Sequence, residues 1–169
     1  MKSTGVALAH LLRNSLPDLR LVVLNACDTA LTSAPPGQDP FGGVAATQPD
    51  TKGHWQKLPQ TTIDLEVAQR RLPPPYLIKL DTHGYELPIL AGSQATLAQT
   101  EALIVECYNF DIAPEARRFP AFCQHMESLG FRCLDLWDPL YRPGDGALWQ
   151  FDLLFVRTAS PAFAQNVYR

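Results

Sequence analysis

Three side chains capable of acid-base chemistry follow one short apolar run in the segment YLIKLDTHGYELPIL, residues 76–90. Asp81, His83 and Glu86 come directly after that run, and Gly84 stands between the last two. The apolar run predicts a buried strand, and the residues after the turn predict a helix. In an open α/β sheet, ligands bind beyond the carboxyl ends of the parallel strands. We therefore expect this turn to carry the chemistry of the protein.

Each residue of the turn has a catalytic or binding role and a simpler structural one. Asp81 is placed to orient an acceptor hydroxyl or take its proton, or simply to satisfy free N–H groups of the turn. His83 is of the residue type that most often serves as a general base near neutral pH, or is an exposed loop histidine. Gly84 would let the backbone approach a substrate closely. Glu86 would contact the substrate, or would serve only as a carboxylate that suits a helix start.

A second polar group ends the next predicted strand, residues 102–107. Glu106, Tyr108 and Asn109 follow its apolar residues and could face the same crevice as the turn. We expect all three to bind substrate. The alternative for Glu106 is a carboxylate at the rim of the sheet without a functional role.

Helical and strand-like patterns alternate along the chain. Pro and Gly are dense between residues 28 and 60, which predicts a loop there. The short, turn-rich connection at residues 141–146 predicts that the last two strands are antiparallel. The expected helices cover residues 6–14, 86–97 and 119–129, a strand leads into a helix over 61–72, and strands cover 20–25, 76–80, 102–107, 131–136 and 149–156. This order predicts a Rossmann-like α/β sheet, mostly parallel with an antiparallel carboxyl-terminal strand.

The composition limits the classes of function. The 169 residues suffice for one core, and a net charge of -3 with 46% hydrophobic residues gives no basic surface for nucleic acid. No apolar run reaches the ~20 residues that cross a bilayer, and no leader opens the chain, so we expect a cytoplasmic protein without a membrane partner. The four cysteines form no C-x-x-C pair and no His lies at metal spacing, which predicts neither a disulfide framework nor a metal site.

The turn also resembles the post-strand motif of the FkbM methyltransferases, which usually reads IKID, two residues, G, one residue and E. Here the motif stands as Ile78 to Asp81, then Thr82, His83, Gly84, Tyr85 and Glu86. His83 replaces the acidic or amide residue common in the family. Further blocks in the family's order extend the resemblance over about residues 58–168, namely residues 60–64, 103–106, 129–132 and 145–152.

The resemblance implies a methyltransferase that uses S-adenosyl-L-methionine (AdoMet), with a small-molecule or sugar hydroxyl as the methyl acceptor. In this family Asp81 and His83 would be catalytic. Such enzymes bind AdoMet through a Gly-rich loop after the first strand, and no G-x-G-x-G precedes Asp81. The AdoMet-binding residues are therefore not identified, and we expect a truncated domain that binds AdoMet poorly and self-associates through exposed sheet edges. Whether the isolated chain is an active enzyme stays open.

The amino-terminal part resembles a different family. Residues 19–30, read LRLVVLNACDTA, and residues 39–46 are similar to the nucleophile strand of CHAT domains, which are caspase-like cysteine peptidases. The resemblance implies that Cys27 is an alternative nucleophile, but His10 lies on a predicted helix and does not match the family's base. Cys27 is otherwise a small buried thiol.

Two domain organisations follow from these resemblances. In the first, a CHAT-like fragment at residues 1–47 is joined by a seam at 48–57 to the methyltransferase-like region 58–169. In the second, the early helix and strand belong to the methyltransferase sheet itself. The fragment could pack on the same sheet in both cases. Besides a methyltransferase or a cysteine peptidase fragment, a non-catalytic interaction fragment remains an alternative.

Overall fold

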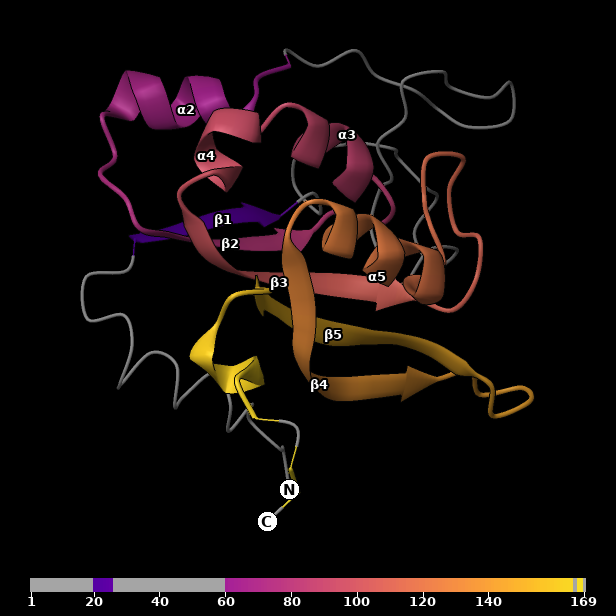
Figure 1. Cartoon of the computed structure of the whole chain (residues 1–169). Helices are drawn as coiled ribbons and strands as arrows, with labels where there is room; N and C mark the ends of the chain where they lie inside the picture. Colours follow the sequence, from indigo (N-terminus) through magenta and orange to yellow (C-terminus); the bar gives the residue numbers. More distant parts are fainter. Residues whose placement is uncertain (1–19, 26–59, 166, 169) are drawn as a thin grey trace.

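The computed structural model describes residues 60–165 and 167–168 together with the backbone of residues 20–25. The expected helix at residues 6–14, Cys27 and the seam at 48–57 lie outside these residues. Figure 1 shows one sheet with helices packed against it. None of the helices in the described ranges is long and apolar enough to span a membrane.

One five-stranded sheet organises the described residues. Strands β1, β2 and β3 are mutually parallel, β5 is antiparallel to β3, and β4 is antiparallel to β5. The expected mostly parallel sheet with an antiparallel carboxyl-terminal strand is therefore confirmed. In spatial order the strands are β1 (Arg20–Asn25), β2 (Tyr76–Asp81), β3 (Thr100–Tyr108), β5 (Leu148–Arg157) and β4 (Phe131–Tyr141).

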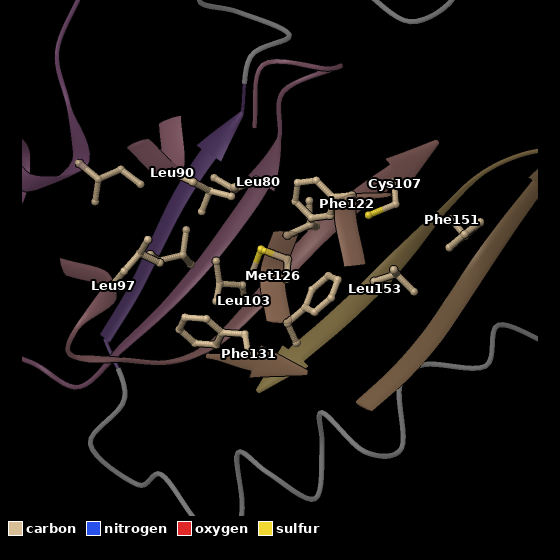
Figure 2. Close-up of a cluster of buried hydrophobic side chains, with 14 residues drawn as sticks. Leu80, Leu90, Leu97, Leu103, Cys107, Phe122, Met126, Phe131, Phe151 and Leu153 are labelled. Atoms are coloured by element: carbon tan, nitrogen blue, oxygen red, sulfur yellow. The ribbon is translucent and has the colours of Figure 1, made fainter. Parts of the chain in front are cut away.

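All the described α-helices contribute to one apolar layer on one face of the sheet. Their bounds are α2 (Ile63–Arg70), α3 (Glu86–Ala91), α4 (Gln94–Leu97) and α5 (Phe119–Ser128). Figure 2 shows the resulting cluster, in which Leu90 of α3 and Met126 of α5 lie with Leu103 of β3 and Leu153 of β5. Burial of such side chains contributes roughly 1.5–3 kcal/mol each. This layer fixes the strands whose ends carry the polar residues.

A smaller cluster occupies the opposite face. Leu77, Ile104 and Leu154 alternate along their strands with residues of the first cluster, as the period of two in a strand requires. Phe163, in the short 3₁₀ helix η2 (Pro161–Phe163), packs against this second cluster. The two faces of the sheet therefore differ, with the described α-helices on one face and η2 on the other.

Two sequence expectations about the helices were wrong. Thr61 and Thr62 form no strand, because Thr62 caps α2 by accepting a hydrogen bond from the Leu65 N–H at 3.2 Å. The single helix expected over 86–97 is two helices, since Gly92 ends α3. A Cβ on Gly92 would lie 2.9 Å from the Thr62 side chain. This close contact between Gly92 and Thr62, the residue that caps α2, leaves no room for a side chain at the point where the helix breaks.

Candidate active site

The turn after β2 is held by the Glu86 carboxylate. Its Oε1 accepts hydrogen bonds from the Thr82 hydroxyl at 2.9 Å and from the Gly84 N–H at 3.1 Å. Glu86 is buried, and so are Thr82 and His83. Glu86 thus satisfies polar groups of the turn as well as starting α3, the structural role considered from the sequence.

Two consecutive residues of this turn have left-handed backbone conformations. His83 has φ 52° and Gly84 has φ 99°. A Cβ on Gly84 would lie 2.9 Å from the Cβ of Ala113 and 3.0 Å from that of Ala116, so the loop before α5 packs directly on this glycine. The close approach at Gly84 is therefore to the protein's own chain. Left-handed φ is uncommon for a residue other than glycine, and His is among the types enriched there.

Asp81, His83 and Glu106 lie together at the carboxyl ends of β2 and β3. His83 Nε2 is 3.4 Å from Asp81 Oδ1 and 3.8 Å from Glu106 Oε2. The side chain of His83 is only 8% exposed, against 13% for Glu106 and 24% for Asp81. The turn and the end of β3 therefore lie side by side, and their role as a ligand crevice stays a prediction. The alternative of an exposed loop histidine was wrong, because His83 is buried.

Hydrogen bonds hold both oxygens of Glu106. The Tyr108 hydroxyl donates to Oε2, and Gln150 Nε2 donates to Oε1. Burial raises the pKa of Glu106, and the nearby carboxylates Asp81 and Asp152 raise it further, against the opposing effects of the Tyr108 hydrogen bond and His83. Burial also raises the pKa of Tyr108, as does its bond to Glu106, so the phenol stays protonated and donates.

Lys79 is the cation of this group. Its Nζ donates to Asp81 Oδ2 at 3.0 Å, from two residues earlier on the same face of β2. Burial raises the pKa of Asp152, opposed by Lys79 and supported by Asp81. Lys79 thus acts on Asp81 and Asp152, whereas the opposing effects on the pKa of Glu106 come from Tyr108 and His83.

The sequence did not identify Lys79, Gln150 and Asp152 as site residues. The register of β3 with β5 places Glu106 opposite Asp152 and Tyr108 opposite Gln150. By the alternation of a strand, these four residues lie on the face opposite the α-helices, beyond the apolar residues of the second cluster. The alternation of polar and apolar residues at the start of Leu148–Arg157 indicated which side chains share a face. The sequence did not indicate the register that places them beside Glu106.

Asn109, another expected site residue, makes backbone-directed contacts instead of joining this group. Asn109 donates from its backbone N–H to the Trp149 carbonyl at 2.9 Å and from Nδ2 to the Leu148 carbonyl at 3.3 Å. It therefore ties β3 to the start of β5. The alternative nucleophile Cys27 is outside the described residues.

A cavity of about 650 Å³ lies beside the β4–β5 turn. Its described lining consists of residues 140–145 and Trp149 and does not include Asp81, His83 or Glu106. The ring of Trp149 meets that of Tyr108 edge-on at 6.3 Å, and Tyr108 bonds to Glu106. Trp149 thus lines the cavity and also contacts Tyr108, the residue that bonds to the carboxylate cluster.

Comparison with protein-family models gives a match to the Methyltransferase FkbM domain over residues 17–133. This range covers more than half of the chain and includes β1, β2, β3 and the turn at Asp81. It begins well before residue 58, where the sequence resemblance was expected to start. None of the comparisons supports the resemblance to CHAT domains. Comparisons with curated proteins and with solved structures give no match.

Proposed function

The chain belongs to the FkbM methyltransferase family, and on that premise we propose that it methylates a hydroxyl oxygen of a small molecule or sugar with AdoMet as donor. AdoMet supplies a methyl group on a positively charged sulfur. The acceptor oxygen bonds to the methyl carbon as the carbon–sulfur bond breaks, and the hydroxyl proton passes to a base. The protein has to position the acceptor and receive that proton.

The observation that carries this proposal is the cluster of Asp81, His83 and Glu106 at the carboxyl end of the sheet. Neighbouring parallel strands present it at the edge where open α/β sheets bind ligands. Carboxylates and imidazole are the side chains that accept a hydroxyl proton near neutral pH. A family assignment and a site of suitable chemistry therefore support the same reaction.

We assign different roles to the three side chains of the cluster from their exposed fractions. Asp81 has the most exposed side chain of the three, so we assign it contact with the acceptor hydroxyl. His83 is more buried than Asp81, and its Nε2 lies within 4 Å of both carboxylates. We propose that His83 holds Asp81 in place and shares the proton that Asp81 takes from the acceptor hydroxyl.

The charge at this edge of the sheet suits AdoMet. Asp81, Glu106 and Asp152 outnumber Lys79, so a sulfonium cation close by would be stabilised if the carboxyls were ionised. In the register of β1 with β2, Asn25 stands opposite Asp81, so the two strands end together. We propose that AdoMet binds beyond these two strand ends, in the crevice that such sheets use for ligands.

Calorimetric titration of the whole chain with AdoMet tests the donor half of the proposal. Saturable micromolar binding is expected if the chain is a working methyltransferase, and it would overturn the expectation of weak binding from the missing Gly-rich loop. Absence of binding would refute the proposed activity for this chain.

Transfer of tritiated methyl from AdoMet to a panel of sugars and small alcohols tests the acceptor half. Asp81→Asn should lower the rate at least 100-fold, the usual size of a general-base contribution, while AdoMet binding is kept. Asp111→Asn is the matched control, because Asp111 is an exposed loop carboxylate with an ion pair to Arg118 at 3.5 Å. Equal rates for both variants would remove Asp81 from the mechanism.

A further inference from the structure

Ligand atoms from three different side chains converge in the candidate site. Asp81 Oδ1, His83 Nε2 and Glu106 Oε2 all lie within 4.8 Å of one another. Neither distance from His83 Nε2, 3.4 Å and 3.8 Å, is that of a good N–H···O hydrogen bond, which is about 2.9 Å. Two atoms that each bind one ion at about 2.1 Å are roughly 3 to 3.5 Å apart. The 3.4 Å separation fits two ligands of one ion, and the 3.8 Å separation exceeds that range by a few tenths of an ångström.

We propose that Asp81, His83 and Glu106 form a binding site for one divalent transition-metal cation. Two carboxylate oxygens and one imidazole nitrogen suit ions from Mn²⁺ to Zn²⁺, whereas Mg²⁺ and Ca²⁺ favour sites made of oxygen alone. Three protein ligands leave coordination positions open for water or a substrate oxygen.

The outer contacts of the cluster orient each carboxylate as a ligand. Lys79 bonds to Oδ2 of Asp81, so that Oδ1 remains on the side of His83. Gln150 bonds to Oε1 of Glu106, and the Tyr108 hydroxyl bonds to Oε2 while leaving a second lone pair. Metal sites commonly hold their ligands by partners of this kind.

The charges of the neighbourhood also favour a cation. Glu106 and Asp152 are directly opposite one another on β3 and β5, and Asp81 ends the next strand. Among the described residues, Lys79 is outnumbered by the carboxyl groups around the buried imidazole of His83. A bound divalent ion would compensate like charges that are costly to keep together in a buried place.

A bound cation would also assist the proposed methyl transfer. An acceptor oxygen in an open coordination position would lose its proton more readily, because a bound metal lowers the pKa of a coordinated hydroxyl. This catalytic consequence rests on the proposed function. Binding of the cation does not, since it depends only on the three side chains.

Titration of the metal-free whole chain with Mn²⁺, followed by the electron paramagnetic resonance signal of free Mn²⁺, tests the site. We expect one equivalent to bind and Zn²⁺ to displace it. His83→Asn and Glu106→Gln should each weaken Mn²⁺ binding at least tenfold. Asn is chosen because it tolerates the left-handed φ of His83, and Gln because it keeps the size of Glu106.

Matched controls separate this site from other histidines and carboxylates. His125→Ala changes a half-buried histidine on α5, and Glu101→Gln changes a carboxylate at the opposite end of β3 from Glu106. Both should leave Mn²⁺ affinity unchanged. Equal affinity in wild type and His83→Asn, with both proteins folded by circular dichroism, would overturn the proposal, as would failure of the wild type to bind Mn²⁺.

The outcomes for the metal and for methyl transfer are distinguishable. Mn²⁺ binding without AdoMet binding would refute the proposed function and leave the cation site standing. AdoMet-dependent methyl transfer that survives chelation, in a chain that binds no Mn²⁺, would refute the cation site alone.

Discussion

Glu86 accepts a hydrogen bond from the Thr82 hydroxyl, so a buried carboxylate at the start of α3 closes the turn that follows β2. The same oxygen also accepts from the Gly84 N–H. The stability of this turn, which carries His83, therefore depends on one acceptor oxygen.

Glu86→Ala should lower the free energy of unfolding by about 2 to 3 kcal/mol, because it leaves buried donors without an acceptor. Glu86→Gln retains an oxygen and should cost less. Urea unfolding gives both values, and Glu127→Ala on the exposed side of α5 is the control. A cost for Glu86→Ala no larger than for Glu127→Ala would contradict this role.

Alanine substitutions at three glycines distinguish the cost of a positive φ from the cost of crowding around a new Cβ. Gly84→Ala should destabilise by roughly 3 kcal/mol, because φ is positive and the new Cβ meets the loop before α5. Gly146→Ala, with φ 69° and open space, should cost about 1 kcal/mol. Gly144→Ala, with open space and no positive φ, should change stability by less than about 0.5 kcal/mol. Thermal or urea unfolding that places Gly146 level with Gly84 would show that crowding is unimportant.

Asp64 links α2 to the amino end of α4. Its Oδ1 accepts from the Thr96 N–H at 2.8 Å and from the Thr96 hydroxyl at 2.6 Å, and Oδ2 accepts from the Ala95 N–H at 3.0 Å. Burial opposes ionisation, but these hydrogen bonds outweigh it and lower the pKa of Asp64 below its usual 3.8. Asp64→Ala should cost about 1 kcal/mol at pH 7, the usual loss for a helix cap at a partly exposed position.

The cost of Asp64→Ala should also depend on pH. A folded pKa below the unfolded one stabilises the protein above pH 3.8, and this contribution disappears as the pH falls through the lowered value. Urea unfolding of both proteins at pH 7 and in the acid range measures the difference. A gap that stays constant or widens in acid would contradict the linkage.

The cysteines of the described residues should react slowly with iodoacetamide at neutral pH. Burial raises the pKa of Cys107 well above its ordinary range and that of Cys133 to about 11, and it also raises the pKa of Cys123. Since the thiolate is the reactive form, little of it is present at pH 7. Mass spectrometry of the alkylated chain gives each rate, with the urea-unfolded protein as reference. Cys107 reacting as fast folded as unfolded would contradict its burial.

The strands were the most predictable part of the fold. Continuous apolar runs identified residues 20–25 and 76–80 because strands buried in a parallel sheet need such residues on both faces. The break at Gly92 was not predictable, since it involves a contact with Thr62, thirty residues away. Local periodicity carries no information about such a contact.

The sequence predicted the three central residues of the candidate site but not the residues that surround them. Asp81, His83 and Glu106 lie at or just after the carboxyl ends of parallel strands, so their shared edge could be inferred from the element order. Gln150 and Asp152 come from a strand whose position beside β3 depends on pairing between distant segments. The expectation of no metal rested on cysteine and histidine spacing, whereas the proposed cation site draws its side chains from the ends of two strands.

The place of β5 between β3 and β4 has a consequence for how the protein folds. β4 precedes β5 in the chain, but in the described sheet it pairs with β5 and not with β3. The two strands can close early as a local hairpin, because contacts close in sequence form faster than distant ones. Docking of that hairpin onto β3 then delivers Gln150 and Asp152 to Glu106 in one event. Glu106 therefore obtains these two neighbours only when β5 pairs with β3.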